Sequence, residues 1–180
     1  ACYVDLDHFK PYNDVYGYRK GDDMLRLTGK ILSGHCDPQK DFVGHIGGDD
    51  FIILFQREEW EQRCRALIDA FVAAVPDFYC VEDRKKGGYI SEDRRGKQVF
   101  HTLATISLGL VKVEPGHYGS HHQIATATAD AKKQAKKIPG NSLFIDRRLG
   151  PYAMEKNHDD AAPELATPAA YTSIRLMVSS

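Results

Sequence analysis

The fold is indicated most clearly by residues 42–55, which read FVGHIGGDDFIILF. Two apolar runs that are typical of β-strands, 42–46 and 51–55, flank a Gly-Gly-Asp-Asp segment at 47–50. Paired glycines followed by aspartates between such runs favour the tight turn of a β-hairpin. We therefore predict an antiparallel hairpin with two adjacent carboxylates at its tip.

Strand and helix signals extend this hairpin in both directions. Residues 2–6 are typical of a short buried strand that ends in carboxylates. After a polar stretch that predicts turns, a helix is expected to begin near Asp22 or Asp23, either of which can cap it. Apolar positions with helical spacing at 58–75 predict a second long helix.

The second half of the chain continues this alternation. Residues 77–101 contain two highly charged turns around a short strand-like run, which predicts a protruding β-arm. A strand at 103–113, an alanine-rich helix at 122–137 and a strand at 141–145 follow. The order β-α-β-β-α-β is the ferredoxin-like pattern. We predict an α+β fold in which helices flank an antiparallel sheet, with an inserted β-arm.

The composition describes one globular domain, or one domain with a tail. Of 180 residues, 42% are apolar and 27% are charged, which argues against wholesale disorder. The 24 basic and 25 acidic residues give a formal net charge of −1, which does not support a nucleic-acid partner. No apolar run approaches the roughly 20 residues of a membrane-spanning helix.

The N-terminus and the cysteines bear on the cellular location. The first residues do not resemble a signal peptide, and the chain lacks an initiator Met, so we expect a fragment of a longer protein. Four scattered cysteines without a CxxC pair are typical of the free thiols of a cytosolic protein, although their number also allows disulfides. We therefore expect a cytoplasmic location, with the chain as a possible cytosolic part of a larger protein.

Two acidic features indicate the chemistry. Asp5 and Asp7 end the first strand, and Asp49 and Asp50 lie at the hairpin tip. Because the first strand and the central hairpin are neighbours in a ferredoxin-like sheet, the two features should meet at one edge. Gathered carboxylates repel one another unless a cation binds, and hard oxygen ligands suit Mg²⁺ or Mn²⁺ together with substrate phosphates. Lysines that can add positive charge for a polyphosphate are Lys10, Lys132, Lys133, Lys136 and Lys137.

Simpler interpretations of these features stay open. Aspartates at a hairpin tip often serve only to form the turn, and a lysine-rich helix face is usually solvated surface. An EF-hand loop that begins at Asp5 fails, because it requires Gly where Lys10 stands and Glu where Tyr16 stands. A phosphatase of the haloacid dehalogenase type is similar over three residues only, with Phe9 where Thr or Val is expected.

Longer motifs resemble the GGDEF domain of diguanylate cyclases. Residues 3–14, YVDLDHFKPYND, are similar to the first strand of that family and the loop after it, and residues 45–51, HIGGDDF, to its signature hairpin. Shorter matches follow in the family's order at 16–18, 21–25, 107–109, 135–136 and Asn141. The resemblance covers residues 2–146 apart from the arm and implies a nucleotide-cyclase-type fold. It divides the chain into a GGDEF-like domain at 1–146, without the segment that normally precedes the first strand, and a C-terminal extension at 147–180.

The resemblance implies a metal site and a pair of catalytic carboxylates. The carboxylates of Asp5 and Asp49 and the carbonyl of Leu6 would be the ligands of Mg²⁺ or Mn²⁺. Asp49 and Asp50 correspond to the two signature carboxylates. One of these would help to deprotonate the attacking 3′-hydroxyl.

The resemblance also implies the residues that bind substrate. Asn13 and Asp22 match positions that hydrogen-bond guanine. Phe9 and Lys10 match the loop that holds the terminal phosphates, and Lys136 matches a phosphate-binding lysine.

The implied activity is the synthesis of cyclic di-GMP from two GTP with release of pyrophosphate, in bacterial second-messenger signalling. Two facing protomers of a homodimer would each hold one GTP, and sensory or phosphodiesterase domains would belong to the full-length chain. The sequence departs from the family pattern at four positions. His45 and Gly140 stand where the family usually has Arg, and Asp50 stands where it usually has Glu. Pro38 stands in place of the Arg of the upstream product-inhibition motif, which ends at Asp41. These departures support an alternative, a catalytically degenerate GTP-binding regulatory domain that controls a linked cyclic di-GMP phosphodiesterase domain.

Overall fold

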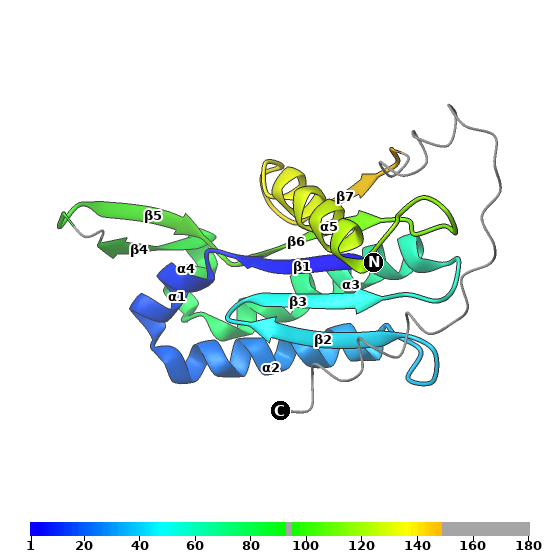
Figure 1. The fold of residues 1–180 in the computed structure, drawn as a ribbon. Helices are drawn as coiled ribbons and strands as arrows, with labels where there is room; N and C mark the ends of the chain where they lie inside the picture. The colour runs from blue at the N-terminus through cyan, green and yellow to red at the C-terminus, as the bar shows by residue number, and fades with distance from the viewer. Residues whose placement is uncertain (93–94, 149–180) are drawn as a thin grey trace.

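The computed structural model describes residues 1–92 and 95–148. Its main sheet has five strands in the order β2-β3-β1-β6-β7 (Figure 1). β1 pairs antiparallel with both β3 and β6, whereas β7 runs parallel to β6 at the edge. The strands are β1 (Cys2–Asp7), β2 (Phe42–Gly47), β3 (Asp50–Leu54), β6 (Thr105–Val111) and β7 (Ser142–Asp146). The predicted α+β fold with a ferredoxin-like, mainly antiparallel sheet is confirmed, and β7 extends it by one strand.

Helices cover the two faces of this sheet. Successive residues of a strand point to opposite faces, and in β1 the residues Cys2, Val4 and Leu6 are buried in the core cluster with residues of α2 and α3. The intervening residues of β1, which include Asp5 and Asp7, therefore face the side on which α5 packs. The helices are α1 (Phe9–Tyr16), α2 (Tyr18–Gly34), α3 (Trp60–Ala74), the 3₁₀ turn η1 (Val75–Phe78), α4 (Val81–Lys86) and α5 (His121–Ala135).

The predicted helix start near Asp22 or Asp23 is wrong, because the polar stretch before it is already helical. α1 follows directly after β1, and α2 begins at Tyr18. Phe9 and Tyr12 lie three residues apart and are both buried, so this stretch presents an apolar helical face despite its polar composition. Gly17, with φ of 86°, separates the two helices in a conformation that favours glycine.

The predicted β-arm is confirmed as a separate two-stranded sheet that projects away from the main sheet (Figure 1). It consists of β4 (Gly88–Glu92) and β5 (Gln98–Thr102). The charged segment before it forms α4 rather than the predicted turn. Aromatic side chains fix the base of the arm: the Tyr79 hydroxyl accepts a hydrogen bond from Ala104 N–H at 2.8 Å, and the Tyr79 and Tyr89 ring centroids are 5.7 Å apart.

The remaining expectations about the chain are met to different extents. All four cysteines lie in the described part of the chain and are free thiols. Among the described helices, none is long and apolar enough to span a membrane. The domain boundary at residue 146 stays a prediction, since residues 149–180 of the predicted extension lie outside the described residues.

Candidate functional site

The hairpin tip lies beside the end of β1. Asp5 of β1 is directly opposite Asp50 of β3 in the antiparallel register. The backbone N–H of Leu6 donates a hydrogen bond to the carbonyl of Asp49 at 3.3 Å. These contacts bring three of the predicted site carboxylates, Asp5, Asp49 and Asp50, to one place on the sheet, as the topology required.

His45 and two glycines fix the shape of the turn. Gly47 and Gly48 have φ angles of 148° and 57°, which favour glycine. The Nε2–H of His45 donates a hydrogen bond to the Gly48 carbonyl at 2.8 Å, and the His45 ring stacks on Phe51 with centroids 4.5 Å apart. His45, which replaces the family's usual Arg, therefore braces the turn that carries Asp49 and Asp50.

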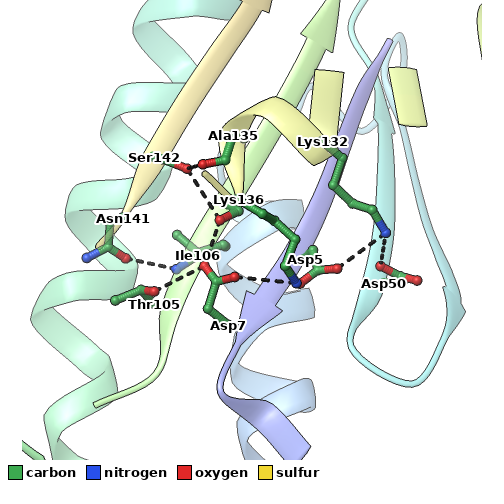
Figure 2. A network of polar contacts seen from close by, with 11 residues as sticks. Asp5, Asp7, Asp50, Thr105, Ile106, Lys132, Ala135, Lys136, Asn141 and Ser142 are labelled. Carbon is green, nitrogen blue, oxygen red and sulfur yellow. Dashed lines mark hydrogen bonds and ion pairs between the residues drawn. The ribbon is translucent and has the colours of Figure 1, made fainter. Parts of the chain in front are cut away.

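Lys132 of α5 and Lys136, the residue directly after this helix, reach across to these carboxylates (Figure 2). Lys132 Nζ lies 3.3 Å from a carboxylate oxygen of Asp5 and 3.0 Å from one of Asp50. Lys136 pairs with the other oxygen of Asp5, and its Nζ lies 3.4 Å from Asp7. Asp5 is thus bound by two ammonium groups at once.

Asp7 has a different role, because other side chains already hold it. Its carboxylate accepts a hydrogen bond from the hydroxyl of Ser107 at 2.6 Å. It accepts another from the hydroxyl of Thr105 at 3.1 Å (Figure 2). Asn141 accepts a hydrogen bond from the backbone N–H of Ile106 at 2.9 Å and ties the start of β7 to the same region. Asp7 therefore helps to hold Lys136 and the neighbouring strands in position.

Burial sets the electrostatics of the carboxylate cluster. It raises the pKa of the Asp5 carboxyl above the ordinary 3.8, against the hydrogen bond and charge of Lys136, and the nearby charge of Asp49 adds to the rise. Burial alone would lower the pKa of Lys132 and Lys136, but their bonds to Asp50 and Asp5 raise both above 10.5. Both lysines are therefore charged at neutral pH, and Asp5 is a buried carboxylate that positive charge stabilises.

The carboxylate and carbonyl oxygens at this place are of the kind that bind a divalent cation, although two lysines already contact the Asp5 carboxylate. Within residues 1–92 and 95–148, no group of three or more His, Cys, Asp or Glu side chains is arranged to hold a metal ion by itself. Mg²⁺ commonly uses one or two carboxylates and takes further ligands from water and substrate phosphates. The groups that could hold it here are the carboxylates of Asp5 and Asp49 with the carbonyl of Leu6.

The residues predicted to bind guanine, Asn13 of α1 and Asp22 of α2, lie near one another, because Asn13 packs on Gly21 of α2. The side-chain oxygen of Asn13 is buried and has no hydrogen-bond partner among the described residues. It packs so closely on Gly21 that a Cβ there would lie 1.8 Å away. Asp22, the next residue, is exposed and lines a pocket of about 290 Å³ together with His45 and Phe51. An unpaired buried amide oxygen is the kind of group that a ligand donor would satisfy.

The residues predicted to hold the terminal phosphates lie at the first turn of α1, not in a loop. The side chain of Phe9 is buried in the core, so only its backbone is available to a ligand. Lys10 is exposed and pairs with Asp14 at 3.2 Å. The first N–H groups of a helix lack partners within the helix and attract anions.

The sequence did not distinguish Lys132 from the other lysines of the last helix. Its place depends on Gly109 of β6, where a Cβ would lie 2.1 Å from the Lys132 backbone nitrogen. Helix and strand can approach this closely only because that glycine has no side chain. The available signal was the four-residue spacing of Lys132 and Lys136, which puts both on one face of a helix beside the buried Ala131 and Ala135.

Comparison with known proteins gives a consistent result. A family model described as diguanylate cyclase, GGDEF domain, matches residues 1–91. The chain is 35% identical over 72 residues to the diguanylate cyclase DgcP of Pseudomonas aeruginosa. The matched segment makes up 40% of this chain and 10% of that protein. The chain is 39% identical over 54 residues to the diguanylate cyclase DgcM of Escherichia coli K12, with coverage of 30% and 13%. The chain therefore spans about a tenth of the length of these relatives.

Solved structures share the fold at low sequence identity. The GGDEF domain of DgcB from Caulobacter crescentus, in complex with c-di-GMP, has a TM-score of 0.57 and 23% identity over 80% of this chain and 75% of that chain. The GGDEF domain of TpbB (YfiN) from Pseudomonas aeruginosa has a TM-score of 0.56 and 18% identity over 88% and 80%. These similarities show a common fold.

Proposed function

Because the chain belongs to the GGDEF domain family, we propose that it binds GTP where β1 meets the β2–β3 hairpin and joins two GTP molecules into cyclic di-GMP. The observation that carries this proposal is the convergence of Asp5, Asp49 and Asp50 where β1 lies beside the tip of the β2–β3 hairpin. The similarity to DgcP and DgcM, which are named diguanylate cyclases, supports it.

The proposed roles follow from where each group lies. Asn13 and Asp22 would bind guanine, since one offers an unpaired buried oxygen and the other lines a pocket with His45 and Phe51. The backbone N–H groups of Phe9 and Lys10 at the α1 N-terminus would donate hydrogen bonds to the terminal phosphates. Lys136 would exchange its carboxylate partners for a phosphate oxygen.

The chemical step is a phosphoryl transfer in each direction between two GTP molecules. A 3′-oxygen of one GTP attacks the α-phosphorus of the other, the bond to the β-phosphate breaks, and pyrophosphate leaves. Asp50 or Asp49 would accept the proton of the 3′-hydroxyl. A bound Mg²⁺ or Mn²⁺ would supply charge stabilisation at the α-phosphate and the leaving group. Because each protomer holds one GTP, turnover requires a homodimer.

The proposal extends to the context of the chain. We take residues 1–146 as the nucleotide-binding domain and 147–180 as an extension, with sensory or phosphodiesterase domains elsewhere in the full-length protein. The substrate is a cytoplasmic nucleotide, so the proposed activity is cytoplasmic, and no nucleic acid is involved.

Incubation of the protein with GTP and Mn²⁺ tests this function directly. We expect cyclic di-GMP and pyrophosphate in a ratio of one to two, and none from Asp49→Asn. GTP binding without product would contradict the cyclase and support the regulatory alternative. Release of free phosphate would support the phosphatase alternative instead.

One observation favours the regulatory alternative. The Asp50 carboxylate is already engaged by Lys132 at 3.0 Å, and it is shorter than the family's usual Glu by about one carbon–carbon bond, roughly 1.5 Å. A misplacement of roughly 1 Å can cost on the order of a hundredfold in rate. If the protein is a slow cyclase, Asp50→Glu should raise cyclic di-GMP formation with little change in GTP affinity. A regulatory domain would form no cyclic di-GMP in either form.

A further inference from the structure

Lys132 has a set of contacts that none of the roles above uses. Its Nζ bridges Asp5 at 3.3 Å and Asp50 at 3.0 Å, which come from two different strands (Figure 2). The same Nζ lies 4.1 Å from the centroid of the Tyr3 ring, within the range of a cation–π contact. Three groups on the sheet therefore converge on this one ammonium.

The main chain holds Lys132 in this position. At Gly109 the backbone of α5 approaches β6 so closely that no side chain would fit between them. The Lys132 side chain is only 18% exposed, whereas that of its neighbour Lys133 is 71% exposed and pairs with Asp130 on the helix surface. Lys132 is thus a partly buried cation held by its contacts rather than part of a solvated lysine-rich face.

A fixed ammonium and a divalent ion compete for the same carboxylate oxygens. The lysine ammonium is a compact point charge with three donors, so it can bind both carboxylates at once. A metal ion that binds Asp5 must take over an oxygen that faces Lys132 or Lys136, and it meets the repulsion of a neighbouring positive charge. That repulsion is strong over a few ångströms in a partly buried site.

We propose that Lys132 is a tethered cation that neutralises Asp5 and Asp50 in the nucleotide-free protein and weakens the binding of a divalent ion to Asp5. The inference rests on the proposed function in one respect, namely that Asp5 is a metal ligand. It adds a residue that sets how tightly this site takes its metal ion.

The test is a titration of the 180-residue protein with Mn²⁺ alone, in which the electron paramagnetic resonance signal of free Mn²⁺ reports binding. Lys132→Met keeps most of the length of the side chain and removes its charge, and it should tighten Mn²⁺ binding by about tenfold, a change of the size that groups around metal ligands produce in metal affinity. Lys132→Gln should tighten it in the same direction. Lys132→Arg, which keeps the charge, and Lys133→Met, which removes a surface charge one residue away, should both stay close to wild type.

The outcomes separate this inference from the proposed function. Unchanged or weaker Mn²⁺ binding in folded Lys132→Met and Lys132→Gln overturns the inference, whereas the proposed metal site stands if Asp5→Ala abolishes binding. Equal tightening in Lys133→Met also overturns it, because the effect would then be one of net charge. Mn²⁺ binding that persists in Asp5→Ala overturns the proposed metal ligand and the inference together.

Discussion

Asp5 and Asp41 are both buried aspartates that pair with basic side chains, yet their surroundings differ. The Asp41 side chain is fully buried and lies 2.7 Å from Arg63, and it accepts backbone hydrogen bonds from Asp37 at 2.7 Å and Gln56 at 2.8 Å. Although burial alone would raise its pKa, these bonds lower the pKa of Asp41 below 3.8. The pKa of Asp5 is raised instead, because burial outweighs the hydrogen bond and charge of Lys136, and the nearby charge of Asp49 adds to the rise.

The difference separates a structural carboxylate from one that suits a ligand. Fixed backbone donors and a guanidinium satisfy Asp41 within the protein, so a ligand has nothing to add. The Asp5 carboxylate pairs with Lys132 and Lys136 instead, and the more exposed Lys136 can exchange it for a phosphate oxygen, as proposed above. By the resemblance described above, Asp41 would take the last position of the family's product-inhibition motif, where Pro38 stands in place of the Arg. We therefore expect no product inhibition through Asp41.

The largest effect should come from Asp5→Ala. The substitution removes a proposed metal ligand, so metal-dependent turnover of GTP should fall by at least about a hundredfold. This loss should exceed the loss caused by removing a group that only orients a metal ligand. Cyclic di-GMP formation at ordinary Mg²⁺ concentrations is the measurement. Wild-type turnover in this variant would remove Asp5 from the site.

Asp41→Ala should act on stability instead. It leaves Arg63 buried without its carboxylate and should lower the free energy of unfolding by about 3 kcal/mol, as measured by urea denaturation. The matched control is Asp14→Ala, which breaks an exposed pair with Lys10 and should cost less than about 1 kcal/mol. A loss for Asp41→Ala no larger than the control's would contradict a structural role.

The pH dependence of this loss has a definite sign. The folded pKa of Asp41 lies below its ordinary 3.8, so its ionisation stabilises the fold at all higher pH and this contribution disappears as pH falls through the lower, folded value. The stability gap between wild type and Asp41→Ala should stay constant from neutral pH to about pH 4 and narrow only below it. A gap that closes well above that pH would show that another group is responsible.

A smaller effect is expected at Asn13, which belongs with Asp5 on the ligand side of the comparison. Its buried oxygen has no partner among the described residues, so Asn13→Ala should not reduce stability. GTP affinity should fall by about tenfold, the loss of one hydrogen bond with a well-placed donor, while ATP affinity should hardly change. Asp22→Ala should shift the same preference. Equal losses for GTP and ATP would argue against guanine recognition here.

The sequence predicted those features that depend on local pattern and strand order. The hairpin at 47–50 and the meeting of Asp5 with Asp50 follow from turn chemistry and from the ferredoxin-like order of strands. The start of α1 was missed because its few apolar residues lie among polar ones and are buried only through tertiary contacts.

Tertiary contacts also decide which lysine reaches the site. Lys132 and Lys133 are adjacent and chemically identical, but only Lys132 faces the carboxylates, because Gly109 lets α5 approach β6 at that residue. The brace that His45 forms with Gly48 likewise depends on the three-dimensional shape of the turn.

The most direct test of the account is a Mn²⁺ titration of wild type, Asp5→Ala and Asp41→Ala side by side, at a temperature where all three are folded. We predict that Asp5→Ala loses Mn²⁺ binding and that Asp41→Ala binds Mn²⁺ as tightly as wild type. Retained binding in Asp5→Ala, or an equal loss in both variants, would contradict the claim that the edge between β1 and the hairpin is the metal and nucleotide site.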